Sequence, residues 1–575
     1  MDRITRSFIQ EMLSLQEMES ESESKDFEKL VNYTVISNYY NRSFDLDYVT
    51  VGEGNDTGID GLGIIVNGQM IETTDEIDDL IDKNGSLEVT FIFTQAKTSA
   101  SFNSGEINTF IFGIKDFFTE DPSLVRNEDI KKFAELSDFL YSKAATFKAN
   151  PDIKLFFVTT GNWTHDQNLS AVINYGKNEL EQKNLFNKVT FEPYGAKELA
   201  AAYRKTKEAI SCTITLENKI TIPSIKGVSE AYIGLLRFSE FTNIIVDEDD
   251  KLLSVFEDNV RDFQGDTNDV NKVINNTVKG ESNDLFGVLN NGVTIVASTI
   301  SSTGDSYQLT DYQIVNGCQT SNVLFNNRHN DNINNVRVPV KMIATTNEEV
   351  KNQITLATNN QTPIKKEQFA ALTDFQRRLE QYYKSFEGDG LLYYERRSKQ
   401  YNTDTSFTKT RIISIPIQIK SFSAMFLQNP HIVTSYFGTI VKKLNSDSSQ
   451  IFNHDHSFIP YYTSALAYYR LESLFRRQKL QSRYKRVRFH LITLFKILAK
   501  SEAHPQMNSE RLMNKYCEPI ITILNDEDKY LPLFQQAIDA VDNADFDLDD
   551  KQHVKQAPKT QLLIDFISSK HKAHK

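Results

Sequence analysis

Cysteine and tryptophan are scarce in this chain, and long apolar runs are absent. Its 575 residues include three cysteines and one tryptophan. Cys212, Cys318 and Cys517 form no CxxC pair, so the sequence implies neither a zinc ribbon nor a disulfide framework and favours reduced thiols in the cytosol. No apolar stretch approaches the roughly 18 residues of a membrane span. Residues 1–25 are charged and lack the apolar core of a signal peptide. We therefore expect a cytoplasmic protein that does not contact membranes.

The glycine-rich loops that bind nucleotides in motor ATPases and in dehydrogenases are also missing. No GxxxxGK[ST] motif and no dinucleotide fingerprint occurs, so motor-type ATP hydrolysis is not expected. The net charge of −13 excludes a protein coated in positive charge, although a local basic stripe can still bind phosphates. Residues 470–488, "RLESLFRRQKLQSRYKRVR", contain eight basic residues and one acid, Glu472. This basic stripe is either the solvated face of a helix or a face that follows phosphates.

The length and the apolar pattern predict an α/β protein of three segments. Length alone suggests three or four domains. Residues 1–205 have the pattern of a mixed α/β domain, residues 206–365 that of a second mixed α/β domain with short strands, and residues 366–575 that of a mainly helical region. Within the first segment we expect a helix at 25–40, a hairpin turn at Asn67-Gly68, and strands at 45–52, 60–66, 87–95 and 153–162.

The predicted strand "LEVTFIFTQAK" ends in two polar side chains on its apolar face. Gln95 and Lys97 share a face with Phe91 and Phe93, because strand side chains alternate. A lysine beside apolar neighbours is costly unless an anion meets it. The pattern therefore indicates an acidic partner, a metal-bound water or a phosphate near Lys97.

A candidate partner lies upstream, in "VGEGNDTGIDGLGIIV". Asp60 precedes a predicted strand and is surrounded by glycines that let other groups approach. The Asp60 carboxylate, the Gln95 amide oxygen and the Ala96 carbonyl are hard oxygen ligands that suit Mg²⁺ or Mn²⁺. Such a metal neutralises a scissile phosphate and lowers the pKa of the attacking water. Lys97 would hold that water or stabilise the developing charge.

These motifs, taken in order, resemble the PD-(D/E)xK nucleases. The variant with Gln in place of the second acid, found in Mrr-type restriction enzymes, matches Phe27-Glu28, residues 56–61 and Gln95-Ala96-Lys97. The resemblance implies a restriction-endonuclease-like fold in which Asp60 and Gln95 bind metal and Lys97 is catalytic. Glu28 would be an accessory catalytic ligand from the first helix. Asp56 we interpret as a turn residue. The alternative is a decayed nuclease fold or coincidence.

A second candidate site is "QIVNGCQTSN", where a predicted strand meets a helix. Free N–H groups at a helix N-terminus favour anions. This predicts a phosphate or nucleotide site at Asn316, Gly317, Gln319, Thr320 and Ser321. The alternative is an ordinary capped helix start.

Residues 210–400 resemble the AIPR family, the abortive-infection phage-resistance proteins. Positions that carry this resemblance are Asn259, Arg261, Gly265, Asn290, Asn291, Gly292, Asn316, Gly317, Gln319, Thr320, Asn359, Asn360, Gln361 and Glu395 to Arg397. Members of that family often have a PD-(D/E)xK-like region in front, which agrees with the nuclease-like motifs at Glu28, Asp60, Gln95 and Lys97 here.

Together the resemblances predict a metal-dependent phage-defence nuclease that the AIPR region gates. We expect nucleic acid as the substrate, DNA in preference to RNA. A homodimer would supply two sites for cutting a duplex, and a regulatory protein or a nucleotide ligand would control activity. The alternative is a nucleic-acid- or nucleotide-binding regulatory protein with an inactive nuclease fold.

Overall fold

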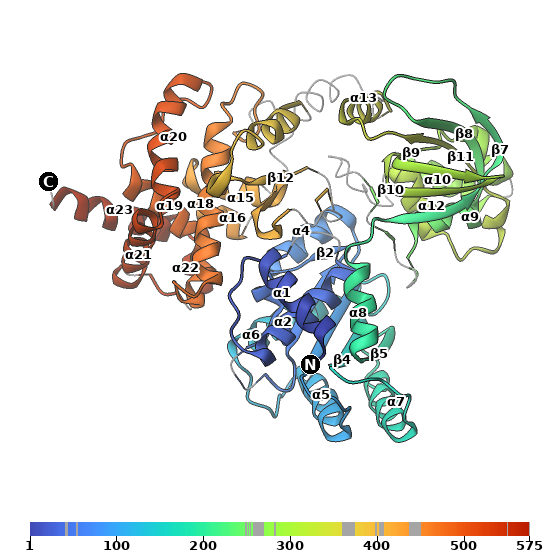
Figure 1. Ribbon diagram of the computed structural model, residues 1–575, viewed down its shortest axis with the longest axis horizontal. Helices are drawn as coiled ribbons and strands as arrows, with labels where there is room; N and C mark the ends of the chain where they lie inside the picture. The colour runs from blue at the N-terminus through green and yellow to red at the C-terminus, as the bar shows by residue number, and fades with distance from the viewer. Residues whose placement is uncertain are drawn as a thin grey trace.

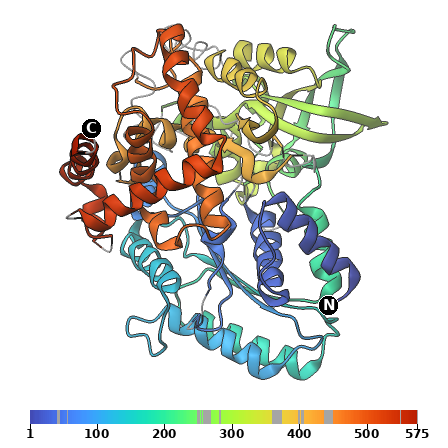
Figure 2. The ribbon, with the colours of Figure 1, turned by 60° about the vertical axis from the view of Figure 1, so that its left-hand side comes forward.

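The computed structural model divides the chain into an N-terminal α/β part, a central sheet with its helices and a helical C-terminal part (Figure 1). It describes residues 1–40, 44–52, 54, 56–247, 250, 252–253, 255–256, 269–280, 283–358, 374–396, 400–401, 407–435, 450–544, 546–548 and 550–573. The N-terminal part lies beneath the other two, as Figures 1 and 2 both show. In the described part of the chain, no helix combines the length and the apolar character needed to cross a bilayer.

The N-terminal domain is built on a mixed five-stranded sheet. The strands are β1 (Gly61–Val66), β2 (Gln69–Met70), β3 (Val89–Lys97), β4 (Asp152–Thr159) and β5 (Lys188–Tyr194). Their order is β2-β1-β3-β4-β5, with β1 antiparallel to β3 and the last three parallel. The helices are α1 (Arg3–Leu15), α2 (Glu23–Tyr39), α3 (Leu46–Val49), α4 (Thr74–Asn84), α5 (Ser104–Phe117), α6 (Glu128–Ser142), η1 (Ala144–Thr146), α7 (Gln167–Glu181) and α8 (Ala196–Lys205).

Helices cover both faces of this sheet, and alternation along β3 decides which residue meets which face. Phe91 and Phe93 pack with α5, α6 and α7, whereas Ile92 and Ala96 pack with α1, α2 and α8. Burial on both faces explains why β3 is apolar along nearly all its length.

Local signals set several of these elements. Asn67 and Gly68 both have positive φ, 49° and 74°, as a tight hairpin between β1 and β2 requires. Helix α4 begins with a capping box at Thr73 and Glu76 and ends at a left-handed Gly85. The strand predicted at 45–52 is wrong, because Asp45 caps the short helix α3 and only Thr50 pairs with the sheet.

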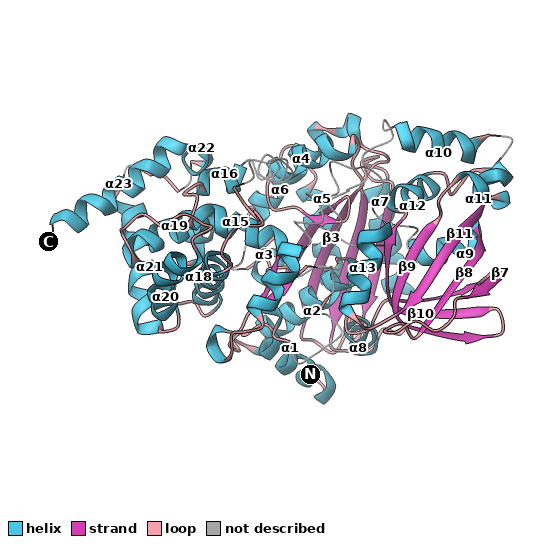
Figure 3. Ribbon diagram, turned by 90° about the horizontal axis from the view of Figure 1, so that it is seen from above, coloured by secondary structure: helices cyan, strands magenta, loops and turns pink. Residues whose placement is uncertain are grey.

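The central part is a six-stranded sheet in the order β6-β10-β9-β11-β8-β7 (Figure 3). Its strands are β6 (Ser211–Thr215), β7 (Glu217–Thr221), β8 (Glu230–Arg237), β9 (Val293–Thr303), β10 (Ser306–Asn316) and β11 (Arg337–Ala344). The helical segments are α9 (Phe238–Ile245), α10 (Asp269–Lys279), η2 (Asn283–Leu285), α11 (Phe286–Leu289), α12 (Cys318–Asn326), η3 (Asp331–Asn335) and α13 (Glu348–Thr358). Apolar residues of α9, α10 and α12 form one core with the sheet.

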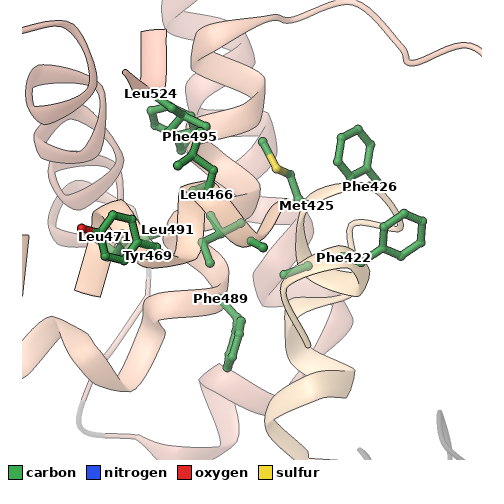
Figure 4. Close-up of a cluster of buried hydrophobic side chains, with 14 of the residues drawn as sticks. Phe422, Met425, Phe426, Leu466, Tyr469, Leu471, Phe489, Leu491, Phe495 and Leu524 are labelled. Atoms are coloured by element: carbon green, nitrogen blue, oxygen red, sulfur yellow. The ribbon is translucent and has the colours of Figure 1, made fainter. Parts of the chain in front are cut away.

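The described residues of the C-terminal part are mainly helical and include two short parallel strands, β12 (Tyr393–Glu395) and β13 (Ile412–Ser414). Its helical segments are η4 (Gly388–Gly390), η5 (Lys409–Arg411), α15 (Ile415–Met425), α16 (Pro430–Ser435), α18 (Ile459–Arg476), η6 (Ser482–Val487), α19 (Arg488–Ala499), α20 (Glu510–Leu524), α21 (Glu527–Asn543), α22 (Lys551–Lys555) and α23 (Ala557–Ala573). Figure 4 shows part of its core, with Leu466 of α18, Phe495 of α19 and Leu524 of α20 lying together. The predicted class, two α/β parts followed by a helical region, is confirmed.

Candidate functional site

Asp60 and Lys97 meet where β1 begins and β3 ends. The Lys97 Nζ lies 3.9 Å from Asp60 Oδ2, and the same oxygen accepts the Ala96 N–H at 2.7 Å. Asp60 is 6% exposed. Burial raises the pKa of Asp60 to about 6, although Lys97 and the Ala96 N–H act in the opposite direction. The carboxylate predicted to face Lys97 is therefore present and has little solvent around it.

Gln95 completes the group from the same strand. It is buried, and its Oε1 has no hydrogen-bond partner among the described residues. A Cβ on Gly58 would lie 3.4 Å from its Nε2, so the Asp-Gly loop lies directly against the amide. A buried acceptor without a donor costs free energy, which makes Gln95 Oε1 an available ligand atom.

The loop before β1 is a tight turn held against α5. Asp56 Oδ1 accepts the Gly58 N–H at 2.8 Å, and its carbonyl accepts the Ile59 N–H at 2.9 Å. A Cβ on Gly113 of α5 would lie 1.8 Å from the Thr57 carbonyl oxygen, so only glycine lets this helix approach the turn. These contacts agree with the interpretation of Asp56 as a turn residue.

Asn32 of α2 anchors the other side of Asp60, a role that the sequence did not reveal. Its amide donates to the Asp60 carbonyl at 2.9 Å, and its Oδ1 accepts the Thr94 hydroxyl. A Cβ on Gly61 would lie 2.2 Å from that Oδ1. Gly61 is therefore required for α2 to reach the strand pair, which gives the second glycine of the "GIDG" segment a physical reason.

Glu28 lies within electrostatic range of Asp60 but has its own partner. Lys25 Nζ lies 2.7 Å from Glu28 Oε2, and the Ser24 hydroxyl donates to Oε1 at 3.4 Å. The charge of Glu28 raises the pKa of Asp60 further, after burial as the main cause. Lys25 was missed by sequence reasoning, although its i,i+3 spacing from Glu28 is a readable signal.

The donors present fit a magnesium or manganese ion. Asp60 and Gln95 offer carboxylate and amide oxygens, the hard ligands that both metals prefer. Within the described ranges, no group of three or more His, Cys, Asp or Glu side chains could hold a metal. The candidate centre would thus bind metal through one carboxylate, one amide and backbone or water oxygens.

The second candidate site forms a glycine turn that leads into α12. Gly317 has a φ of 100°, and a Cβ there would lie 2.7 Å from the Val293 side chain, so glycine is required. The Asn316 amide donates to the Thr358 carbonyl, and the Ser321 hydroxyl donates to the Gly317 carbonyl at 2.9 Å. These two predicted contact groups are already occupied.

The backbone at this turn leaves the prediction open. No side chain caps α12 at Gly317. Gln319 Oε1 is buried without a partner in the described part of the chain, and Thr320 is buried. Of the positions that carried the family resemblance, Asn259, Arg261, Gly265, Asn359 to Gln361 and Arg397 lie outside the described residues.

Carboxylates and carbonyls occupy much of the basic stripe, whereas Lys479, Arg483 and Arg486 are exposed. Within the C-terminal part, the pairs are Arg477–Glu527 at 2.8 Å, Arg488–Glu472 at 3.5 Å and Arg483–Asp542 at 3.7 Å. Two other members reach the N-terminal domain: Lys485 contacts Asp47 at 2.9 Å and Asp45 at 3.4 Å, and Arg476 lies 3.8 Å from Glu17. The stripe therefore helps to join two parts of the molecule.

A cavity of about 2710 Å³ lies where the three parts meet. Its lining includes Lys25 and Gly52 of the N-terminal domain, Asn322 of the central part and Arg476 of the C-terminal part. Asp60, Gln95 and Lys97 are not in the lining, although Lys25, the ion-pair partner of Glu28, is.

Comparison with known proteins gives one match. The sequence model of the family described as "AIPR protein" matches residues 256–544, which include strands β9, β10 and β11 of the central sheet and much of the helical part. No curated protein and no solved structure matches the chain.

Proposed function

The chain belongs to the AIPR family, the abortive-infection phage-resistance proteins, and from this premise we propose that it is a phage-defence nuclease. Its N-terminal domain hydrolyses phosphodiester bonds of nucleic acid, DNA in preference to RNA, and the AIPR region gates that activity. A homodimer would bring two such centres to a duplex.

One observation supports the proposal: Asp60 Oδ2 lies 3.9 Å from Lys97 Nζ, and Lys97 is two residues along β3 from Gln95. Gln95 Oε1 is buried and has no donor among the described residues. A fully satisfied structural cluster would leave no acceptor unpaired. Mg²⁺ or Mn²⁺, held by Asp60 and Gln95, would supply charge neutralisation and a more acidic water.

The residues of this chain would then divide the work. Asp60 is held by the Ala96 N–H and, through its carbonyl, by Asn32. Lys97, with its side chain 32% exposed, can reach both the carboxylate and a phosphate oxygen in solvent. Its ammonium would stabilise the negative charge that develops on the phosphate.

A cleavage assay tests the assignment. Wild type, Asp60→Ala and Lys97→Ala are incubated with duplex DNA, single-stranded DNA and RNA in Mg²⁺ or Mn²⁺. Each variant should lose at least about a hundredfold in rate. Asp121→Ala and Lys131→Ala, which remove the same charges at exposed positions, are the matched controls. Equal rates in all five proteins would refute the assignment to this site.

The same variants can be compared in cells if the purified protein needs a trigger. Expression of wild type and of both controls should protect cells from phage. Protection by Asp60→Ala equal to that by wild type would favour the alternative, a regulatory protein with an inactive nuclease fold.

The uncapped N-terminus of α12 favours that second candidate, an anion-binding function at residues 316–321. Thermal shift with nucleotides tests it, because a ligand at 100 times its Kd stabilises a fold by about 2.7 kcal/mol. Absence of any shift with nucleotides would remove this candidate.

A further inference from the structure

Three arginines gather around one tyrosine in the C-terminal part. The guanidinium carbons of Arg411, Arg470 and Arg476 lie 5.2, 5.3 and 5.9 Å from the Tyr469 ring centroid. We call these four residues the arginine cluster. Like charges held this close repel one another unless an anion lies among them.

The anion is Glu17, which comes from the other end of the chain. Its carboxylate accepts hydrogen bonds from the Thr410 hydroxyl at 2.7 Å, the Tyr469 hydroxyl at 2.8 Å and Arg411 Nε at 2.9 Å. Arg476 Nη2 adds an ion pair at 3.8 Å. Burial alone would raise the pKa of Glu17, but these hydrogen bonds and the charge of Arg411 hold it below its ordinary value.

Contacts that do not involve Glu17 hold two arginines of the arginine cluster in place. Arg411 Nη1 donates to three backbone carbonyls within residues 388–391, and Arg470 Nη2 donates to a carbonyl of the same segment. Fixed donors of this kind lose little side-chain freedom when an anion binds, which favours recognition of planar or multi-oxygen anions.

The arginine cluster has more donors than Glu17 uses. Arg476 Nε and Arg470 Nε are buried and have no hydrogen-bond partner among the described residues, and Arg476 Nη2, also buried, has the 3.8 Å ion pair with Glu17 in place of a hydrogen bond. Both arginines are nearly inaccessible, with Arg470 9% exposed and the Arg476 side chain 11% exposed. A phosphoryl group presents more oxygens than a carboxylate and can carry more charge, so it would satisfy donors that Glu17 leaves unpaired.

Glu17 reaches the arginine cluster from a left-handed backbone conformation, which is unfavourable for a glutamate. It follows the C-terminus of α1 with a φ of 49°, and the next residue, Met18, donates its N–H to the Leu13 carbonyl at 2.9 Å. Helices that end in this way usually have glycine at the left-handed position, because a side chain is strained there. Helix termination does not explain a glutamate at this position, whereas its contacts with the arginine cluster do.

One side of the arginine cluster, at Tyr469 and Arg476, borders the interdomain cavity. Thr410, Tyr469 and Arg476 are part of the cavity lining, and so are Lys25 and Gly52 of the N-terminal domain. Two other ion pairs join the N-terminal domain to the C-terminal part: Asp75 with Lys555 at 2.8 Å and Glu76 with Lys420 at 3.4 Å. The N-terminal domain supplies the acid in each pair, and the C-terminal part supplies the base.

We propose that the arginine cluster is a phosphoryl-binding site and that Glu17 is its internal occupant. A ligand phosphoryl group replaces the Glu17 carboxylate and so releases the N-terminal domain from the C-terminal part. The proposal extends the gating part of the proposed function. Only the effect of releasing the N-terminal domain rests on that function, because phosphoryl binding does not require nuclease chemistry.

Binding of a labelled single-stranded oligonucleotide to the full chain tests the site. Fluorescence anisotropy is measured in EDTA, so that cleavage does not interfere. Glu17→Gln removes the internal competitor and should raise the affinity roughly tenfold, because apparent affinity scales with the fraction of open sites. Adding Arg476→Ala to Glu17→Gln should cancel the gain. Glu19→Gln, an exposed neighbour with the same loss of charge, should bind as wild type.

Competition identifies the source of the phosphoryl group. Inorganic phosphate, ATP and unlabelled duplex are each added to Glu17→Gln with the labelled strand. Displacement by ATP points to a free nucleotide, and displacement by nucleic acid alone points to a phosphodiester backbone; either outcome supports the proposal.

Glu17→Gly guards against misfolding, because glycine suits the left-handed backbone. It should show the same gain as Glu17→Gln. The proposal is overturned if neither variant gains affinity for any probe, or if the gain survives Arg476→Ala. An inactive nuclease with an intact gain would refute the proposed function and leave this site standing.

Discussion

Replacing Gly61, the residue that follows Asp60, by alanine should disrupt the candidate centre. The added Cβ would lie 2.2 Å from Asn32 Oδ1 and 2.4 Å from Thr94 Oγ1. Neither neighbour can withdraw freely, because the Asn32 amide also donates to the Asp60 carbonyl at 2.9 Å. The strands must separate, or α2 must move outward and give up these hydrogen bonds.

The magnitude follows from two contributions. Overpacking a well-filled site costs roughly 1–3 kcal/mol. Loss of one or two hydrogen bonds of Asn32 adds about 1 kcal/mol each. The free energy of unfolding of the Gly61→Ala variant should therefore be about 2–5 kcal/mol lower than that of wild type. A domain of about 200 residues loses roughly 2–4 °C of Tm per kcal/mol, which predicts a drop of roughly 4–20 °C.

Thermal unfolding of the full chain, followed by circular dichroism, measures the effect on the first transition. Gly52→Ala is the matched control, because a Cβ there meets no atom within 4 Å. Asn32→Ala removes the clash partner, so Gly61→Ala combined with Asn32→Ala should cost less than the sum of the two single changes. Strict additivity, or a Gly61→Ala protein that melts with the control, would refute the packing argument.

The remaining predictions concern charges. Lys485→Ala leaves Asp45 and Asp47 unpaired at the domain boundary and should lower the urea midpoint by an amount equivalent to about 1–3 kcal/mol, and an unchanged midpoint would contradict it. Burial opposes ionisation of Asp45, but nearby charges, Lys485 first, lower its pKa from 3.8 to about 2, so its stabilising effect is complete above about pH 4 and is lost as the pH falls to about 2. The Tm of Asp45→Asn should accordingly vary less than that of wild type over that range, and parallel curves would count against the pairing. Lys25→Met frees Glu28 and removes a cation near the centre, so calorimetry should show Mn²⁺ binding several-fold tighter than in wild type, and weaker binding would sink the idea.

Much of the N-terminal site could be read from local sequence. Period-two alternation places Gln95 and Lys97 on the face of Phe91 and Phe93. The structure agrees for Gln95, because its amide and α5 both lie against Gly58, and α5 packs on Phe91 and Phe93. The Asn67-Gly68 turn also follows from local chemistry. Such features depend on residues a few positions apart, which is why pattern reasoning finds them.

The parts that sequence reasoning missed depend on distant partners. The basic stripe has the composition of a phosphate-binding face, but Lys485 pairs with Asp45 and Asp47, more than four hundred positions earlier. Glu17 and Arg411 are equally remote in the chain, and nothing beside Glu17 signals the pairing. Whether a basic residue is paired with a distant acid depends on the tertiary arrangement, so composition alone could not distinguish an open basic face from a paired one.

The central claim is that Asp60 and Gln95 hold a divalent metal next to Lys97. A crystal structure of the wild-type protein grown with Mn²⁺, with anomalous data collected at the manganese edge, tests it most directly. We expect an anomalous peak in contact with both the Asp60 carboxylate and Gln95 Oε1, and loss of that peak in Asp60→Ala. A peak bound elsewhere, or no peak at a Mn²⁺ concentration at which the protein cuts nucleic acid, would contradict it.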